Sequence, residues 1–483
     1  MTSGNRLSMP SGLTTIRKLQ CMLARPLLSV ALLVGLCQAS LPQYEALELG
    51  PEEAASPSPT GGVTLFQNVR IFDGKSAALS APSSVLVRGS TIEQISANPA
   101  ATEAGADVRV INANGRVLMP GLIDAHWHMF MAAVAPAVLV TADPGYLNLL
   151  AAREAEATLM RGFTTIRDMG GPVFGLKRAI DEGVTVGPRI FPSGAMISQT
   201  SGHGDFRSRH EVPRTLGGPL SQSELEGVAA IADSPDEVRL RAREQLRQGA
   251  SQIKLMAGGG VNSPHNPIES TQFTEAELHA AVEAAENWGT YVAVHAYTPA
   301  AIRQAIAAGV KCIEHGHLID EPTAKLLADK GIWWSLQPLT YDAAVFARLS
   351  PASQKKALEV FAGTENAYKL AKKYKIKTAW GADILGDAEA ARRQGQYLAM
   401  MVRWYTPAEA LKMATADNGE LMALSGFINP YPGKLGVVEV GALADLLLVD
   451  GNPLEDINLV ANPDKNFVVI MKNGKIYKNA LKP

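Results

Sequence analysis

The stretch MPGLIDAHWH, from Met119 to His128, places two histidines two residues apart at the end of an apolar segment. In a β-strand, residues i and i+2 point to the same face, so the rings of His126 and His128 can both reach one metal ion. A pair of strand histidines that binds no ligand is the alternative. Because the chain of 483 residues contains only nine histidines, the pair favours a metal site at the end of a strand.

Four other apolar segments contain or end in a side chain that can bind a metal. Lys254 lies inside one of them, where a charged ammonium group would be costly. His295 and Asp383 end two more, and a fourth ends in His315-Gly-His317. Taken singly, these residues have ordinary explanations: a hydrogen-bonded core histidine, a lysine that reaches solvent, or an aspartate that caps a helix. The ordered set His-x-His, Lys, His, His, Asp instead predicts one site.

Strand and helix patterns alternate between Leu118 and about Pro430, and 47% of the chain is hydrophobic, enough for a large core. Eight segments are predicted as strands: Leu122–His128, Phe163–Asp168, Arg189–Ser198, Gln252–Ala257, Tyr291–Ala296, Cys312–His317, Gly331–Leu336 and Thr378–Asp383. Helices are expected between most of them, such as Pro235–Gln248 and Thr274–Asn287, which starts with a capping-box pattern. This order predicts an α/β fold, a (β/α)8 TIM barrel of residues 118–430, whose strands converge with their carboxyl ends at one mouth.

The chain ends are expected to form separate parts. Residues 63–117 and 431–483 alternate short β-type runs with turn residues, which predicts a small β-sandwich built from both ends. Residues 40–62 are rich in Pro, Ala, Ser and Glu, which is typical of a mobile leader. Residues 1–39 resemble an export signal peptide, because basic residues precede a short apolar run and Ala39 provides a cleavage site.

Export would place the protein in the periplasm or outside the cell. Lipid anchoring at Cys37 is the alternative, although the bulky Leu36 before it is unusual in a lipoprotein signal. Cleavage after residue 39 would remove Cys21 and Cys37 and leave Cys312, so no intramolecular disulfide is expected. No membrane-spanning segment is expected. The net charge of −2 provides no basic surface for nucleic acid.

The ordered ligand set resembles that of the amidohydrolase superfamily, specifically its binuclear metal-dependent members. The resemblance extends from near Val63 to Lys475 and includes flanking phrases such as NVRIFDG from Asn68 and GALADLLLV from Gly441. It implies two divalent metal ions, with Zn²⁺ as the expected ion. It implies as their ligands His126, His128, Lys254, His295, His315 and Asp383.

In this scheme His126 and His128 hold one ion, His295 and His315 hold the other, and a carboxylated Lys254 bridges both. Burial makes the neutral lysine available for reaction with carbon dioxide. A metal-bridging hydroxide would attack the carbonyl carbon. Asp383 would orient this hydroxide and carry the proton to the leaving nitrogen. The ring of His317 lies on the same strand face as that of His315, so His317 remains the alternative ligand.

Phrases near the ligands narrow the reaction class. Mononuclear deaminases show His-x-x-Glu where this chain has His295-Ala-Tyr-Thr298, and imidazolonepropionase-like enzymes lack the bridging lysine. The phrase SGAMISQTSGHGD, from Ser193 to Asp205, resembles Xaa-Pro dipeptidases (prolidase-like) and ochratoxin A-hydrolysing amidohydrolases. We therefore expect cleavage of the amide bond before a C-terminal amino acid in a small-molecule amide or dipeptide. Such substrates include Xaa-Pro dipeptides, N-acyl amino acids and ochratoxin A, an acyl-phenylalanine.

The free carboxylate of such a substrate needs polar partners, and the candidates are His203, Arg207, Tyr297 and His317. Tyr297 lies two residues after His295 and can donate a hydrogen bond, whereas His203 or Arg207 can contribute charge. A packed aromatic role for Tyr297 and a surface ion pair for Arg207 are the alternatives. Ochratoxin hydrolases can carry His where this chain has Tyr297. The sequence therefore leaves open which substrate of this class the protein cleaves.

Two loops are candidates for shaping specificity. The apolar segment Met129–Leu150 is predicted to line a substrate pocket or to pack against another subunit, and the Gly-rich segment Gln199–Ile231 is predicted to be a lid. A homo-oligomer is expected, an octamer by resemblance. Hydrolysis of cyclic amides or lactones is an alternative function, as is a non-catalytic amidohydrolase-like binding protein.

Overall fold

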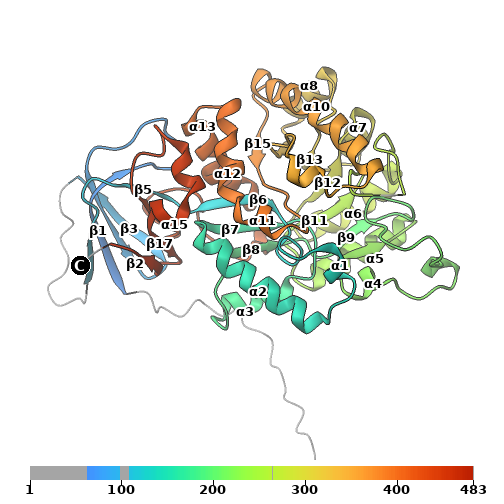
Figure 1. Cartoon of the computed structure of the whole chain (residues 1–483), viewed down its shortest axis with the longest axis horizontal. Coiled ribbons are helices and arrows are strands. Elements are labelled where there is room, and N and C mark those ends of the chain that lie inside the picture. Colours follow the sequence, from blue (N-terminus) through green and yellow to red (C-terminus); the bar gives the residue numbers. More distant parts are fainter. Residues whose placement is uncertain (1–61, 98–107, 264, 482–483) are drawn as a thin grey trace, which may run out of the picture. The chain divides into compact units, whose positions relative to one another are not determined.

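The computed structural model of the chain describes residues 62–97, 108–263 and 265–481, except for the side chain of Ala344. The predicted signal peptide, nearly all of the predicted leader, and the cysteines at 21 and 37 lie outside the described residues. The described chain contains a β-sheet region built from both chain ends and a larger α/β region between them (Figure 1). Within these ranges, no helix is both long and apolar enough to cross a membrane.

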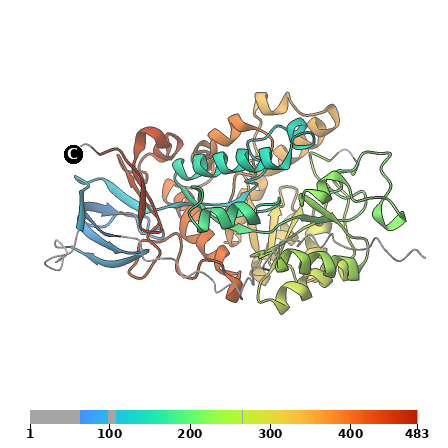
Figure 2. The ribbon, with the colours of Figure 1, turned by 90° about the horizontal axis from the view of Figure 1, so that it is seen from below.

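The sheet region contains eight strands. They are β1 (Val63–Ile71), β2 (Ser83–Arg88), β3 (Thr91–Ser96), β4 (Val108–Asn112), β5 (Val117–Pro120), β16 (Leu446–Val449), β17 (Phe467–Lys472) and β18 (Lys475–Asn479). They follow one hydrogen-bonded path in the order β18-β17-β16-β5-β1-β2-β3, and β4 pairs with β1. The two chain ends meet where β5 and β16 pair antiparallel, with Met119 opposite Leu447. Figure 2 shows the blue and red strands together from a second side.

Strand β1 changes neighbours along its length. Its first half pairs with β2 and β4, whereas Arg70 and Ile71 pair with β5. The change follows a register shift between Phe66 and Val69, where Asn68 has a φ of 55°. Asparagine tolerates this left-handed conformation better than most residues. The strands expected in the sandwich therefore belong to one continuous sheet that passes through β1.

The α/β region contains two parallel sheets. The first consists of β6 (Leu122–Trp127), β7 (Phe163–Asp168) and β8 (Arg189–Pro192). The second has the order β10 (Ala229–Ile231), β9 (Met196–Ser198), β11 (Ile253–Met256), β12 (Val292–Ala296), β13 (Cys312–His315), β14 (Trp333–Leu336) and β15 (Thr378–Trp380). Nearly all of their residues are buried, as expected for parallel sheets that are covered on both faces.

The eight strands predicted for this region all overlap observed strands, but the third is divided. Arg189–Ser198 forms β8 and β9, because Gly194 between them has a φ of 71° and turns the backbone. Backbone hydrogen bonds join the three-stranded sheet to the seven-stranded sheet at both edges of the three-stranded sheet. Ser251 N donates to Pro192 O at 2.7 Å, and Asp383 N donates to His126 O at 2.9 Å.

Helices follow most of these strands. The longer ones are α2 (Pro144–Met160), α3 (Phe174–Asp181), α5 (Pro235–Arg247), α6 (Glu275–Asn287), α7 (Pro299–Ala307), α8 (Glu321–Lys330) and α10 (Pro351–Lys373). The shorter ones are α1 (Pro136–Leu139), α4 (Gln222–Leu225), α9 (Ala343–Phe346), α11 (Ala388–Arg392), α12 (Gln394–Ala399), α13 (Pro407–Lys412), α14 (Asn418–Ala423) and α15 (Pro463–Asn466). The capping box predicted at the start of α6 is confirmed, because the side chains of Thr274 and Glu277 each accept a hydrogen bond from the other residue's backbone N–H.

The two predicted specificity loops differ in their packing. In Met129–Leu150, Phe130 and Met131 are buried in the main hydrophobic core, whereas Tyr146 is 53% exposed on α2. Phe130 and Met131 are therefore core residues, and Tyr146 is a surface residue. The segment Gln199–Ile231 contains α4, β10 and a short 3-10 turn.

Candidate metal centre

The six residues of the expected metal site lie in or shortly after five parallel strands. They are His126 in β6, His128 just after it, Lys254 in β11, His295 in β12, His315 at the end of β13 and Asp383 after β15. His315 and Asp383 have φ values of 70° and 50°, a conformation that side chains with a Cβ rarely adopt. Backbone strain of this kind is concentrated at functional sites. The strain at both strand ends therefore supports a functional role.

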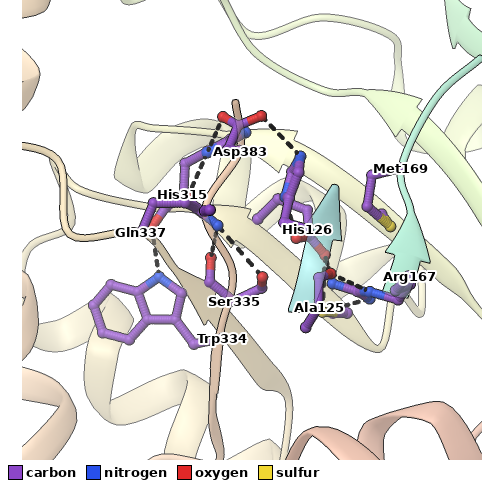
Figure 3. A network of polar contacts seen from close by, with 12 residues as sticks. Ala125, His126, Arg167, Met169, His315, Trp334, Ser335, Gln337 and Asp383 are labelled. Carbon is purple, nitrogen blue, oxygen red and sulfur yellow. Dashed lines mark hydrogen bonds and ion pairs between the residues drawn. The ribbon is translucent and has the colours of Figure 1, made fainter. Parts of the chain in front are cut away.

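Asp383 lies among three histidines. Its Oδ1 is 3.3 Å from Nε2 of both His126 and His128, and its Oδ2 is 3.7 Å from Nδ1 of His315. The ligand atoms of His126, His315 and Asp383 all lie within 4.8 Å of one another, so they can hold a metal ion. Figure 3 shows Asp383 between these two rings. Gly381 permits the close approach, because a Cβ there would lie 2.6 Å from His126 N.

The two histidines of the opening motif each have one ring nitrogen held by an acceptor. Nδ1 of His126 is 2.7 Å from Oε2 of Glu314, and Nδ1 of His128 is 3.0 Å from the carbonyl oxygen of Gly170. Because a carbonyl or carboxylate oxygen can only accept, each Nδ1 carries the proton. Burial lowers the pKa of His126 well below its ordinary value, so this ring is neutral and its Nε2 presents a lone pair toward Asp383, as a metal ligand must.

His295 and His315 form a second pair, with ring centroids 4.5 Å apart. His295 donates from Nε2 to Gly259 O at 3.0 Å, which leaves its Nδ1 with a lone pair. Nδ1 of His315 lies 2.7 Å from Oε1 of Gln337, which leaves its Nε2 available. Burial lowers the pKa of both rings well below the ordinary value. Both are therefore neutral and able to bind a metal.

Two further ionisable groups belong to the expected metal site, the carboxylate of Asp383 and the amine of Lys254, and their surroundings differ. Burial by itself raises the pKa of Asp383, but His126 and His128 outweigh it and hold the pKa below its usual value. Lys254 is 1% exposed, and its amine has no hydrogen-bond or ion-pair partner among the residues that the structure describes. Burial lowers the pKa of Lys254, although the charges of Glu314 and Asp383 oppose the change. A neutral amine is therefore more accessible here than at the surface.

His203 and Tyr297 both lie next to His295. Their ring centroids are 4.3 Å and 4.9 Å from that of His295. Nδ1 of His203 is buried, and no hydrogen-bond partner for it occurs within the described part of the chain. The same part of the chain also contains no hydrogen-bond partner for the Tyr297 hydroxyl. Both residues therefore present unpaired polar atoms beside the proposed metal ligands.

His317 and Arg207 have protein partners. His317 donates from Nε2 to Gln337 O at 2.9 Å, and its ring centroid is 6.0 Å from that of Tyr297. Arg207 donates two hydrogen bonds to Asp205, at 2.7 and 2.6 Å. The charge of Arg207 is therefore balanced within its own loop. This ion pair is largely buried, with Arg207 only 9% exposed.

Sequence reasoning does not identify three charged residues that contact the centre. Glu314 directly precedes His315, and Arg167 lies in the apolar run of β7. A charged residue inside an apolar strand is uncommon, and this was the sequence signal that could have identified both residues. Burial raises the pKa of Glu314, but the charges of Arg167 and Lys254 outweigh it and hold the pKa below its usual value. Glu314 is therefore an anion.

The third such residue, Asp124, joins β6 to the segment that carries Asp383. Its Oδ1 accepts hydrogen bonds from His126 N at 3.0 Å and Ala382 N at 3.2 Å, and its Oδ2 accepts one from Gln394 at 2.8 Å. Burial raises the pKa of Asp124 to about 7. Asp124 thus ties the backbone of two proposed ligand segments together.

Comparison with known proteins places the chain in a family. A sequence model described as the amidohydrolase family matches residues 117–477. The chain belongs to the amidohydrolase family. This amidohydrolase is 33% identical to ochratoxinase of Aspergillus niger over 379 residues, which cover 75% of the chain and 76% of ochratoxinase.

Two solved structures are also similar to this amidohydrolase. One is an amidohydrolase with 36% identity and a TM-score of 0.79, which covers 87% of this chain and 100% of its own. The other is a prolidase complexed with N-methylphosphonate-L-proline, with 34% identity and a TM-score of 0.79, which covers 86% of this chain and 100% of its own. These relatives support a hydrolase.

Proposed function

We propose that this amidohydrolase is a metal-dependent enzyme that cleaves the amide bond before a C-terminal amino acid. Its substrates would be Xaa-Pro dipeptides, N-acyl amino acids or ochratoxin A-like acyl-phenylalanines. The observation that carries the proposal is the arrangement of three buried histidines, His126, His128 and His315, around the carboxylate of Asp383. The similarity to a prolidase and to ochratoxinase supports this substrate class.

The supporting architecture we propose is a closed (β/α)8 barrel of residues 118–430, with residues 63–117 and 431–483 as a β-sandwich. The hydrogen bonds at both edges of the three-stranded sheet, which join it to the seven-stranded sheet, support closure. A barrel brings the carboxyl ends of its strands to one mouth, which accounts for ligands from five strands.

The residues fit two divalent metal ions, with Zn²⁺ as the expected ion. His126, His128 and Asp383 would hold one ion, and His295 and His315 the other. When bound, the ions would lower the pKa of a water molecule and polarise the amide carbonyl. Lys254 would join both sites after carboxylation, in which carbon dioxide forms a C–N bond with the neutral amine and one proton is released. This reaction replaces an unpaired buried amine with an anion.

Asp383 would act as the base and then as the acid of the reaction. Its carboxylate would take a proton from the attacking water and deliver it to the nitrogen as the amide C–N bond breaks. The amine then leaves in its neutral form. The hydrogen bond from Asp383 N to His126 O, at 2.9 Å, holds the segment that carries the carboxylate in place for both transfers.

The free carboxylate of the substrate would bind beside His295. The hydroxyl of Tyr297 would donate a hydrogen bond to it. The unpaired Nδ1 of His203 would donate a second hydrogen bond when His203 is in the tautomer with its proton on Nδ1. His317 would support the ring of Tyr297, because the two rings are neighbours. Arg207 would order the loop through Asp205.

A panel of substrates tests the proposal. We expect hydrolysis of an acyl-phenylalanine, an Xaa-Pro dipeptide or ochratoxin A, and much slower hydrolysis of matched substrates that end in a carboxamide. Activity confined to a hydantoin or a lactone would instead indicate a hydrolase of cyclic substrates. Metal analysis provides the second check. Protein purified with less than about one equivalent of metal, and inactive after metal is added, would contradict an enzymatic role.

A further inference from the structure

Arg167 and Glu314 form a buried ion pair next to the proposed metal centre. Their side chains are both 0% exposed, and Nη2 of Arg167 donates to Oε1 of Glu314 at 2.7 Å. Arg167 also donates from Nε to Ala125 O at 2.6 Å and from Nη1 to the Tyr291 hydroxyl at 3.2 Å. Figure 3 shows Arg167 beside Ala125 and His126. Its guanidinium group therefore links β7 to β6 and β13.

Stability alone does not explain a pair of charges in this position. Two buried ions lose their hydration, and apolar residues of similar volume often replace such a pair without loss of stability. A second buried pair, Arg189 and Asp445, joins β8 to the sheet region, where both side chains also bond to Asn473 and not to a proposed metal ligand. The pair of Arg167 and Glu314 instead continues to a proposed metal ligand, because Oε2 of Glu314 is 2.7 Å from Nδ1 of His126.

We propose that Arg167 and Glu314 are positioning residues that hold His126 in the tautomer with its proton on Nδ1. The carboxylate of Glu314 can only accept, so His126 donates from Nδ1 and its Nε2 carries the lone pair. Arg167 and the thiol of Cys312, 3.1 Å from Oε1, hold the other oxygen of Glu314. The available Nε2 of His126 then lies 3.3 Å from Asp383.

This arrangement acts through His126 and not on the substrate. A carboxylate on the far nitrogen of a ligating histidine orients the ring and makes it a stronger ligand, and losing such a partner typically weakens metal binding by about 10–100-fold. The inference rests on the proposed function, because it assumes that His126 binds a metal.

Metal titration of a double variant tests the inference. Arg167→Met/Glu314→Gln removes both charges and approximately keeps the side-chain volumes. After metal depletion, wild type and variant are titrated with Zn²⁺ in competition with a chelating dye. We expect the variant to bind Zn²⁺ about 10–100-fold more weakly while its circular dichroism stays that of a folded protein. Equal affinities would overturn the inference.

The matched control is Arg189→Met/Asp445→Asn, which removes a buried pair of the same type away from the centre. It is expected to change the unfolding temperature and to leave Zn²⁺ affinity unchanged, because distant sites act independently. A similar loss of affinity in this control would show that the effect is general destabilisation. That result would also overturn the inference.

The tautomer of His126 can also be measured directly in the metal-free wild type. This test does not depend on whether the Arg167 and Glu314 variant folds. The ¹⁵N chemical shifts of its labelled histidines report each tautomer, and His126→Asn assigns the resonances of His126. We expect a proton on Nδ1 of His126, and a proton on Nε2 would overturn the inference. Wild type with the expected tautomer and Zn²⁺ binding but no amide hydrolysis would overturn the proposed function alone.

Discussion

Two lysines are buried among the described residues, one in each region of the molecule. Lys472, in β17 of the sheet region, is 6% exposed and donates to Gly187 O at 2.6 Å. Lys254, in β11 of the α/β region, is 1% exposed and has no such partner within the described ranges. Burial lowers the pKa of both, that of Lys472 to about 8. A hydrogen bond partly offsets the desolvation cost of Lys472, whereas at Lys254 the charges of Glu314 and Asp383 oppose it.

The difference shows how buried polar groups distinguish structure from function. The core of the sheet region is apolar, and the buried ion pair of Arg189 and Asp445, which joins β8 to this region, has a further hydrogen-bond partner in Asn473. In the proposed metal centre, Lys254 and Nδ1 of His203 lack partners among the described residues. Because native proteins satisfy nearly all buried polar groups, an unsatisfied cluster indicates a site for a ligand.

Lys254→Ala is expected to have the largest effect. If a carboxylated Lys254 bridges two ions, its loss removes a direct ligand. The fall in kcat/KM should then exceed the roughly 100-fold that follows loss of an outer partner. Kinetics on an acyl amino acid and metal analysis of the purified variant provide the measurement. Activity close to wild type would rule out the carbamate, and Lys472→Met is the matched control, expected to keep kcat/KM.

Tyr297→Phe is expected to have the next largest effect. The change removes only the hydroxyl, and a hydrogen bond to a charged group contributes about 1.5–3 kcal/mol, so kcat/KM should fall about 10–150-fold. Substrates that end in a carboxamide should lose much less. Equal losses on both kinds of substrate would place the hydroxyl away from the carboxylate.

Lys472→Met should change the dependence of stability on pH without affecting activity. Between pH 8 and 10.5, the folded wild type has released the proton of Lys472 whereas the unfolded chain still holds it. The unfolded state then binds more protons, so the free energy of unfolding rises with pH, by on the order of 3 kcal/mol for this group. Urea unfolding of both proteins across this range should show the rise in wild type only. If the free energy of unfolding changed with pH in the same way in both proteins, the lowered pKa of Lys472 would be contradicted.

Arg207→Gln should have the smallest effect on catalysis. Like Lys472, Arg207 already has its own partner, in Asp205. We therefore expect KM to change by less than about 3-fold, or about 0.7 kcal/mol. Steady-state kinetics with an acyl-phenylalanine measures the effect. An increase of tenfold or more would instead place Arg207 at the substrate carboxylate.

Several features of the fold and centre were accessible from local sequence patterns. Capping residues mark the start of α6, and apolar runs mark the strands, because both depend on neighbours in the chain. The division at Gly194 was missed although the sequence carries a turn signal there, the run Pro192-Ser193-Gly194 inside the predicted strand. The pairing of Arg167 with Glu314 was also missed, because 147 positions separate the two residues.

By itself, the sequence determined the succession of strands and helices and the set of chemically distinctive side chains at the strand ends. Only the tertiary structure decided that Asp383 lies between His126 and His315, and that Glu314 holds the far nitrogen of His126. It also decided that one buried lysine has a carbonyl partner and the other does not. The physical reason is that periodicity and capping are local, whereas distances between strands and the partners of buried charges depend on how the whole chain packs.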